Sequence, residues 1–201
     1  MAKRAARGKK RIGPEKPARS RKSPGEVAKA RNAPGAVIQV DANDRALRDH
    51  LADLFGKGNA HADWRDILNG IPEALRGVKP ARAPHSAWQL LEHLRIAQWD
   101  ILEFSRNPKH VSPQFPLGYW PATEMPPSVT AWETSVKAFE RDLAEMRELV
   151  SHPKTDLFAR IPHGDGQTIL REALVLADHN AYHLGQIVLL RRMLGAWTAS
   201  Y

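Results

Sequence analysis

Two histidines, His179 and His183, lie four residues apart in the stretch "LADHNAYHLGQ" (176–186). Apolar residues recur around them at helical spacing, so both imidazoles lie on one side of an expected helix. Imidazoles one turn apart can each bring a ring nitrogen to about 2.0–2.1 Å from one divalent metal ion. The chain contains no cysteine, so any metal it binds must have nitrogen and oxygen ligands. The pair therefore suggests part of a nitrogen-ligated metal site.

A third candidate ligand is His93, in the middle of another expected helix, "LLEHLRIAQWD" (90–100). A helical bundle can bring that helix opposite His179 and His183. Three histidines leave one coordination position open, where a water or thiol loses a proton near neutral pH, which favours catalysis over a structural role. Spacing alone leaves an alternative: the pair arises by chance, and each buried imidazole is hydrogen-bonded to a carbonyl or carboxylate.

Other polar side chains lie on the same helix faces. At about 100° per residue, Glu172 and Gln186 fall within about 20° of His179, and Asp100 falls on the stripe of His93. Glu172 and Asp100 are therefore candidate catalytic groups, either as general bases or as carboxylates that orient the ligands. The alternative is that both are surface carboxylates near helix ends.

The other histidines and three helical tryptophans are expected to have ordinary roles. The tryptophans Trp88, Trp99 and Trp132 fit helix packing better than a ligand cage. Solvent exposure is expected for the remaining six histidines, which are His50, His61, His85, His110, His152 and His163.

Hydrophobic periodicity and capping residues predict four long helices. Ser86 with Gln89 forms a capping box, Ser128 and Thr168 are further expected N-caps, and no segment alternates like a strand. The fold class is therefore all-α, a four-helix bundle with a short helical piece after the first helix. The long helices are expected within 41–58, 86–106, 129–151 and 168–194, and the short piece within 61–75.

A proline-rich stretch over residues 108–127 separates the second and third long helices. It contains Pro113, Pro116 and Pro121, and it is too broken for a helix and too irregular for paired strands. Loops of this length inside a compact domain are often functional. We therefore expect a small-molecule substrate to bind between the metal and this loop.

The positive charge of the chain is concentrated at its N-terminus. Residues 1–32 carry 12 Lys or Arg against two acidic residues, whereas the remainder carries 18 basic and 20 acidic residues. We expect a disordered basic tail over 1–38 and a helical domain over 39–201. The tail could make weak, salt-sensitive contacts with nucleic acid or another polyanion, or simply improve solubility. No segment approaches the roughly 20 apolar residues of a membrane span, so a soluble cytoplasmic protein is expected.

Two segments resemble the DinB-like superfamily of helical metalloproteins: "HSAWQLLEHLRIAQWDIL" and "GDGQTILREALVLADHNAYHLGQIVLLRRMLGAW". The resemblance covers about residues 43–197. It implies a four-helix bundle in which one histidine of the second long helix and two of the last hold a metal ion, usually zinc or nickel. In this sequence those ligands are His93, His179 and His183.

The resemblance implies less about the reaction. Proteins of the superfamily include S-transferases that use low-molecular-weight thiols such as bacillithiol or mycothiol, a thiol-dependent isomerase and metal-dependent hydrolases. It therefore implies a divalent-metal-dependent enzyme, a thiol-dependent transferase or a hydrolase, that acts on a small molecule. The alternative is a non-enzymatic metal-binding or stress-associated bundle. Members often pair through helix faces, and the abundance of apolar helix surface here is consistent with a homodimer.

Overall fold

The computed structural model describes residues 41–56 and 60–197, and this part of the chain is helical, with no strand. The predicted tail over 1–38 lies outside the described residues. None of the described helices is both long and apolar enough to cross a membrane. The helices are α1 (Ala42–Gly56), α2 (Trp64–Asn69), α3 (Ala87–Arg106), α4 (Ala131–Ser151) and α5 (Ile169–Met193), with short 3-10 turns η1 (Glu73–Leu75) and η2 (Leu117–Tyr119).

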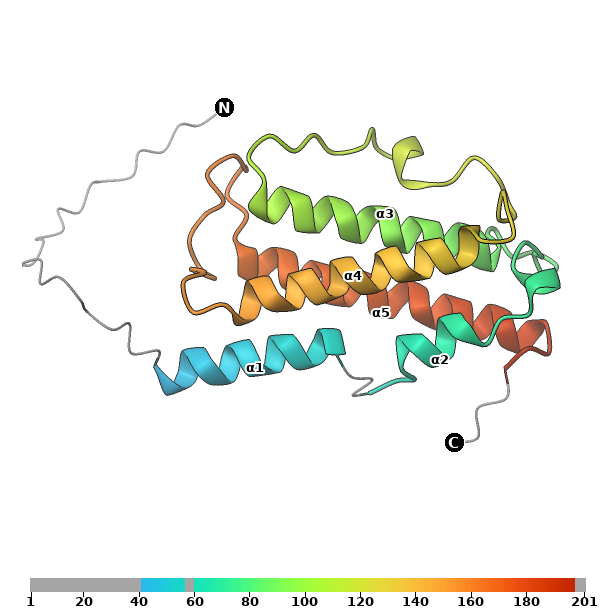
Figure 1. The fold of residues 1–201 in the computed structure, drawn as a ribbon, viewed down its shortest axis with the longest axis horizontal. Coiled ribbons are helices and arrows are strands. Elements are labelled where there is room, and N and C mark those ends of the chain that lie inside the picture. Colours follow the sequence, from blue (N-terminus) through green and yellow to red (C-terminus); the bar gives the residue numbers. More distant parts are fainter. Residues whose placement is uncertain (1–40, 57–59, 198–201) are drawn as a thin grey trace, which may run out of the picture. The chain divides into compact units, whose positions relative to one another are not determined.

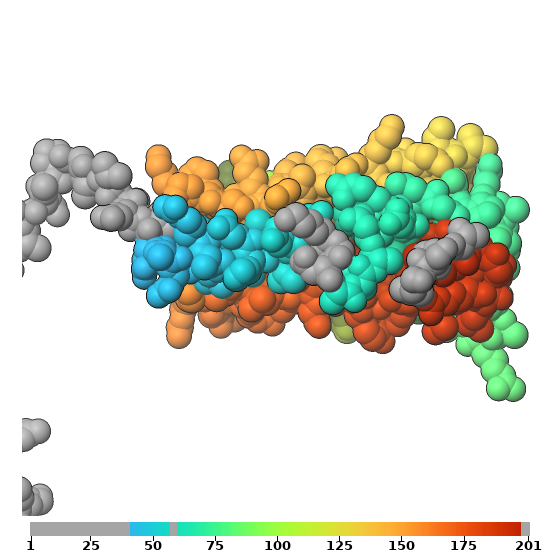
Figure 2. Space-filling view, turned by 90° about the horizontal axis from the view of Figure 1, so that it is seen from below, coloured from blue at the N-terminus to red at the C-terminus, as the bar shows by residue number. Residues whose placement is uncertain are grey.

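The four long helices pack as a bundle, as predicted. Helix α3 lies against both α4 and α5, and α1 lies against α4. Figure 1 shows that α3 and α5 run in opposite directions, and Figure 2 shows α1 and α2 along one face of the bundle, with α4 and α5 on either side. Apolar side chains from α1 to α5 fill the core, the largest fully buried ones including Ile67, Leu91, Leu94, Trp132, Phe139, Leu176 and Ile187.

Two of the three helix caps that the sequence predicts are confirmed. The Ser86 hydroxyl accepts a hydrogen bond from the Gln89 backbone N–H, and the Gln89 side chain accepts one from the Ser86 N–H. Thr168 caps α5 through the backbone N–H of Arg171. The prediction that Ser128 caps α4 is wrong by two residues, because residues 128–131 form a separate turn in front of the helix.

The proline-rich loop after α3 is fastened to that helix by the buried carboxylate of Asp100. The Tyr119 hydroxyl donates a hydrogen bond to Asp100 Oδ2 at 2.6 Å, and His110 Nε2 lies 2.7 Å from Asp100 Oδ1. The expectation that His110 is solvated is therefore wrong: its side chain is only 5% exposed. A buried carboxylate requires hydrogen-bond partners, and the loop supplies them.

Two buried arginines tie helix ends to distant segments. Arg48 of α1 donates hydrogen bonds to the carbonyl oxygens of Val150, His152 and Thr155 at the end of α4. Arg191 of α5 does the same for carbonyl groups around the end of α2. The last carbonyls of a helix have no partner within it, so these guanidinium groups replace the missing donors.

Candidate metal centre

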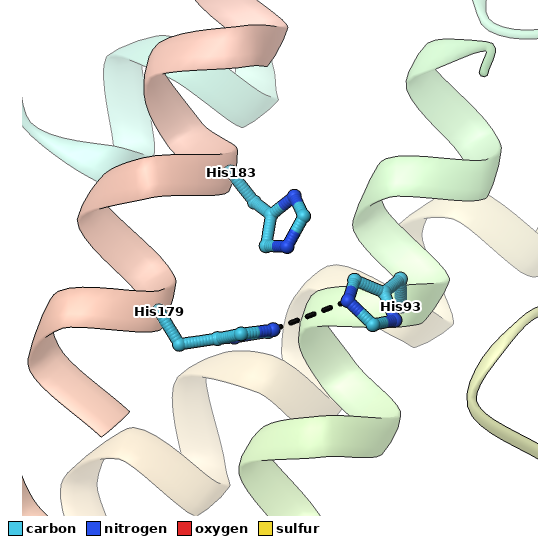
Figure 3. Close-up of side chains that lie close together, drawn as sticks. All are labelled: His93, His179 and His183. Carbon is cyan, nitrogen blue, oxygen red and sulfur yellow. Dashed lines mark hydrogen bonds between the residues drawn. The ribbon is translucent and has the colours of Figure 1, made fainter. Parts of the chain in front are cut away.

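The three predicted ligands meet between α3 and α5 (Figure 3). His93 comes from α3, and His179 and His183 come from successive turns of α5. One ring nitrogen from each histidine lies within 4.8 Å of the other two. His179 Nε2 and His93 Nε2 are 3.1 Å apart. The structure thus brings together residues that are 86 positions apart in the chain.

A buried amide pair fixes the register that makes this possible. Asn180 of α5 donates a hydrogen bond to the Gln98 side chain of α3 at 2.8 Å. Gln98 in turn donates to the carbonyl of Phe139 in α4 at 2.6 Å. Because a buried amide is costly to leave unpaired, these bonds oppose sliding of α5 along α3. They lie beside His179 and hold it opposite His93.

The outer nitrogens of two rings are held by oxygen acceptors. His93 Nδ1 lies 2.9 Å from the carbonyl oxygen of Tyr119, and His183 Nδ1 lies 2.8 Å from Gln186 Oε1. Each oxygen can only accept, so Nδ1 carries the proton and Nε2 of each ring bears a lone pair; that of His93 accepts the hydrogen bond from His179 Nε2. This is the arrangement that orients histidine ligands in metal sites.

The distances fit a bound divalent ion. A tetrahedral ion with bonds of 2.0–2.1 Å places its ligand nitrogens about 3.3 Å apart, close to the 3.1 Å between His179 Nε2 and His93 Nε2. Within the described residues, the buried His179 Nδ1 lacks the oxygen acceptor that Nδ1 has in the other two rings. Among the described residues no carboxylate belongs to the cluster, so the protein offers three neutral ligands.

The rings are neutral at physiological pH. Burial penalises the charged imidazolium and, with repulsion from His183 and His93, lowers the pKa of His179 to about 4. Burial also lowers the pKa of His93 and of His183, although their Tyr119 and Gln186 acceptors act in the opposite direction. Metal binding requires deprotonated imidazole, so these shifts favour metal uptake even in mildly acidic solution.

The same shifts predict acid lability of the metal-free protein. As the pH falls from 6.5 towards 4, the unfolded chain takes up a proton at residue 179 before the folded chain does, so the free energy of unfolding decreases. We expect a loss of about 1–2 kcal/mol at this site, allowing for the partial exposure of the ring. Urea unfolding of chelator-treated protein at several pH values measures it. A His179→Asn variant should lose less stability over this range, and an equal loss would contradict the explanation.

Trp120 and His85 are site residues that the sequence reasoning missed. The His93 ring stacks on the Trp120 indole with centroids 4.0 Å apart, and the His85 ring stacks on the same indole at 4.0 Å. Two rings that both stack nearly parallel on one indole at this distance cannot share a face, so they lie on opposite faces of it. The expectation that His85 is solvated is wrong, because its Nδ1 is buried. The aromatic pair Tyr119 and Trp120, inside a proline-rich loop, was the available signal.

Trp120 should contribute to metal affinity without binding the metal. In a Trp120→Ala variant the His93 ring loses its stacking surface and its fixed orientation. We expect the zinc affinity to fall about 10-fold, the lower end of what loss of a supporting group costs. Competition with a chromophoric chelator measures this. Trp120→Phe keeps an aromatic face and should restore most of the affinity; equal losses in both variants would argue against stacking.

The two carboxylates on the histidine stripes lie away from the cluster. Each is seven residues from a ligand, about 10 Å along its helix, Glu172 from His179 and Asp100 from His93. Glu172 is buried and pairs with Arg171. Asp100 is linked to His93 through Tyr119, whose hydroxyl binds Asp100 and whose carbonyl accepts from His93. A catalytic role for either carboxylate stays a prediction.

The described fold and site define a class: a bundle of four long helices with a three-histidine cluster between two antiparallel helices. The sequence profile of the DinB superfamily matches residues 59–187, a span that includes all three histidines. The chain therefore belongs to the DinB superfamily. Comparisons of this chain with curated proteins and with solved structures gave no match.

Proposed function

We propose that the protein binds one divalent metal ion, zinc or nickel, through His93, His179 and His183. We further propose that the protein is an enzyme that uses this ion to act on a small molecule. The observation that supports this most directly is the convergence of three neutral imidazoles, with no further protein ligand in their cluster among the described residues. Structural zinc sites usually have four protein ligands, whereas catalytic sites keep one position for water or substrate.

A metal ion bound there would act as a Lewis acid and lower the pKa of a water or thiol that occupies its open position. The protein's own residues orient the site: Tyr119 and Gln186 fix two ligand rings, and Trp120 shields His93 from solvent. Because the chain has no cysteine, thiol chemistry would require a low-molecular-weight thiol as cofactor. We therefore propose thiol-dependent S-transfer or hydrolysis.

A paired screen tests the proposal. Protein loaded with zinc or nickel is incubated with an electrophile such as 1-chloro-2,4-dinitrobenzene plus bacillithiol, mycothiol or glutathione, and separately with activated esters. We expect turnover with one of these groups, and its loss on chelation and in the His179→Ala variant. Turnover that survives both treatments would refute a metal-dependent reaction at this site.

The distance of Glu172 and Asp100 from the cluster favours a second candidate, a non-enzymatic metal-binding bundle. Neither carboxylate belongs to the group of metal-binding side chains, so within the described residues no carboxylate lies among the candidate ligands to act as a general base. X-ray absorption of the metal-loaded protein separates the two proposals. Four protein ligands and no exchangeable water would support the non-enzymatic role, whereas three imidazoles and one light, exchangeable ligand would support the enzyme.

The basic N-terminal segment supports a separate proposal, weak binding of a polyanion. Its 12 basic residues within positions 1–32 would release counterions on contact with phosphates. We expect affinity for duplex DNA to fall steeply between 50 and 200 mM salt, as measured by fluorescence anisotropy. Unchanged affinity after deletion of residues 1–38 would refute this role.

A further inference from the structure

A pocket of about 460 Å³ lies at the start of α3 and the end of α5, and its lining includes Gln186, which accepts the hydrogen bond from His183. Its floor is made by Leu90 of α3 and Leu190 of α5, both buried. Leu189 and Met193 form part of its rim and are 59% and 56% exposed. Exposed large apolar side chains around a concave surface are typical of ligand-binding sites.

The pocket continues the seam between α3 and α5 in which the histidines lie. The two helices are antiparallel (Figure 1), so moving backwards along α3 corresponds to moving forwards along α5. Leu90 precedes His93 by three residues and Leu190 follows His183 by seven. At 1.5 Å per residue, the pocket floor therefore begins about 5 Å from the histidines and extends to about 10 Å along the helices.

Two side chains belong to the pocket wall and also support the histidine cluster. Gln186 lines the pocket and accepts the hydrogen bond from His183 Nδ1. His85 lines the pocket and stacks on Trp120, which stacks on His93. A molecule in the pocket would therefore touch the groups that orient two of the three ligands.

The chemistry of the wall selects the class of ligand. Among the described residues that line it there is no carboxylate, Arg82 is the one permanently charged residue, and most of the others are aliphatic. The histidine cluster also has no carboxylate in the described part of the chain, so a bound divalent ion would keep its positive charge. An apolar body suits the pocket and an anionic head group suits the metal.

On this basis, which rests on the proposed metal centre, we infer that the pocket binds the apolar body of the molecule whose head group reaches the metal. The ligand class is a small alkyl or aryl compound with a metal-binding anionic group, a carboxylate or thiolate. The occupant thus lies along the α3 and α5 seam, whereas the proline-rich loop closes the site over His93.

Straight-chain carboxylates from acetate to octanoate are suitable probes. They are titrated into the zinc-loaded full chain by isothermal calorimetry. We expect affinity to rise with each added methylene by up to about fourfold, the value for full burial of the group. Octylamine, which has the same chain and the opposite charge, should bind much more weakly than octanoate.

Two variants test whether the dependence of affinity on chain length arises in the pocket. Ala83→Trp fills the pocket and should make affinity nearly independent of chain length while acetate binding and zinc content remain unchanged. Leu189→Ala, at the exposed rim, should weaken octanoate by about threefold without altering acetate binding. Leu174→Ala is the matched control, because Leu174 is 48% exposed on the same helix and does not line the pocket.

The outcomes separate this inference from the proposed function. If the protein binds zinc but its affinity for carboxylates does not depend on their chain length, the inference is overturned and the metal centre stands. The same holds if the dependence on chain length persists in both pocket variants. A protein that binds no metal would overturn both. A dimer in sedimentation velocity that is dissociated by Leu189→Ala, with no chain-length effect, would show that a second copy covers the pocket and would also overturn it.

Discussion

Replacing His179 by alanine lowers the zinc affinity of the protein by more than about 100-fold, because two of three imidazoles cannot complete a site that the described chain supplies with no carboxylate. His179 Nε2 lies 3.1 Å from His93 Nε2, so its loss removes one of the three converging nitrogens. Competition with chelators and elemental analysis measure the change. The His93→Ala and His183→Ala variants should behave alike.

The control is His50→Ala, which removes an exposed histidine of α1 away from the cluster. Zinc affinity in this variant should match that of the unaltered protein. Far-ultraviolet circular dichroism of His179→Ala should retain its helical signal, because the ring contributes little to the apolar core. Stoichiometric, tight zinc binding by His179→Ala would place the metal elsewhere and refute the three-histidine centre.

Replacing Arg191 by leucine should destabilise the protein by about 3–4 kcal/mol. The guanidinium is buried and donates to the carbonyls of Asp66, Ile67 and Gly70 at 2.6–2.8 Å, and Nε donates to Ala196 at 3.0 Å. Leucine fills much of the volume but leaves these acceptors without donors. Urea unfolding measures the loss, and the melting temperature should fall by about 10 °C.

Arg192→Leu is the matched control on the same helix. Arg192 is exposed, so the substitution should cost less than about 1 kcal/mol. Equal effects of the two substitutions would show that the carbonyl network around Arg191 contributes little. A reduced slope of the Arg191→Leu unfolding transition would instead indicate that α2 has detached before the rest of the bundle unfolds.

Local patterns in the sequence predicted most of the fold. The period of apolar residues located all four long helices, since a helix must bury one face, and Ser86 and Thr168 marked where two of them begin. The position of α4 was less certain because Ser128 belongs to a turn that resembles a cap in sequence. The tail over 1–38 and the cytoplasmic location stay predictions.

The sequence by itself also identified the candidate ligands. Two imidazoles four residues apart on a helix share a side regardless of the rest of the fold, so His179 and His183 could be paired from spacing. His93 could be proposed because of its position on another helix and the superfamily resemblance. Glu172 and Asp100 were less informative. A residue on the same helix face as a histidine points the same way, but it can lie too far along the helix to reach the same site.

Only the tertiary structure decided what surrounds those ligands. Packing of the proline-rich loop on α3 places Trp120 between His93 and His85, and the antiparallel register of α3 and α5 creates the apolar pocket beside them. His110 was expected in solvent and is buried against Asp100 for the same reason. Contacts between residues distant in the chain depend on helix register and loop path, which periodicity within one segment does not specify.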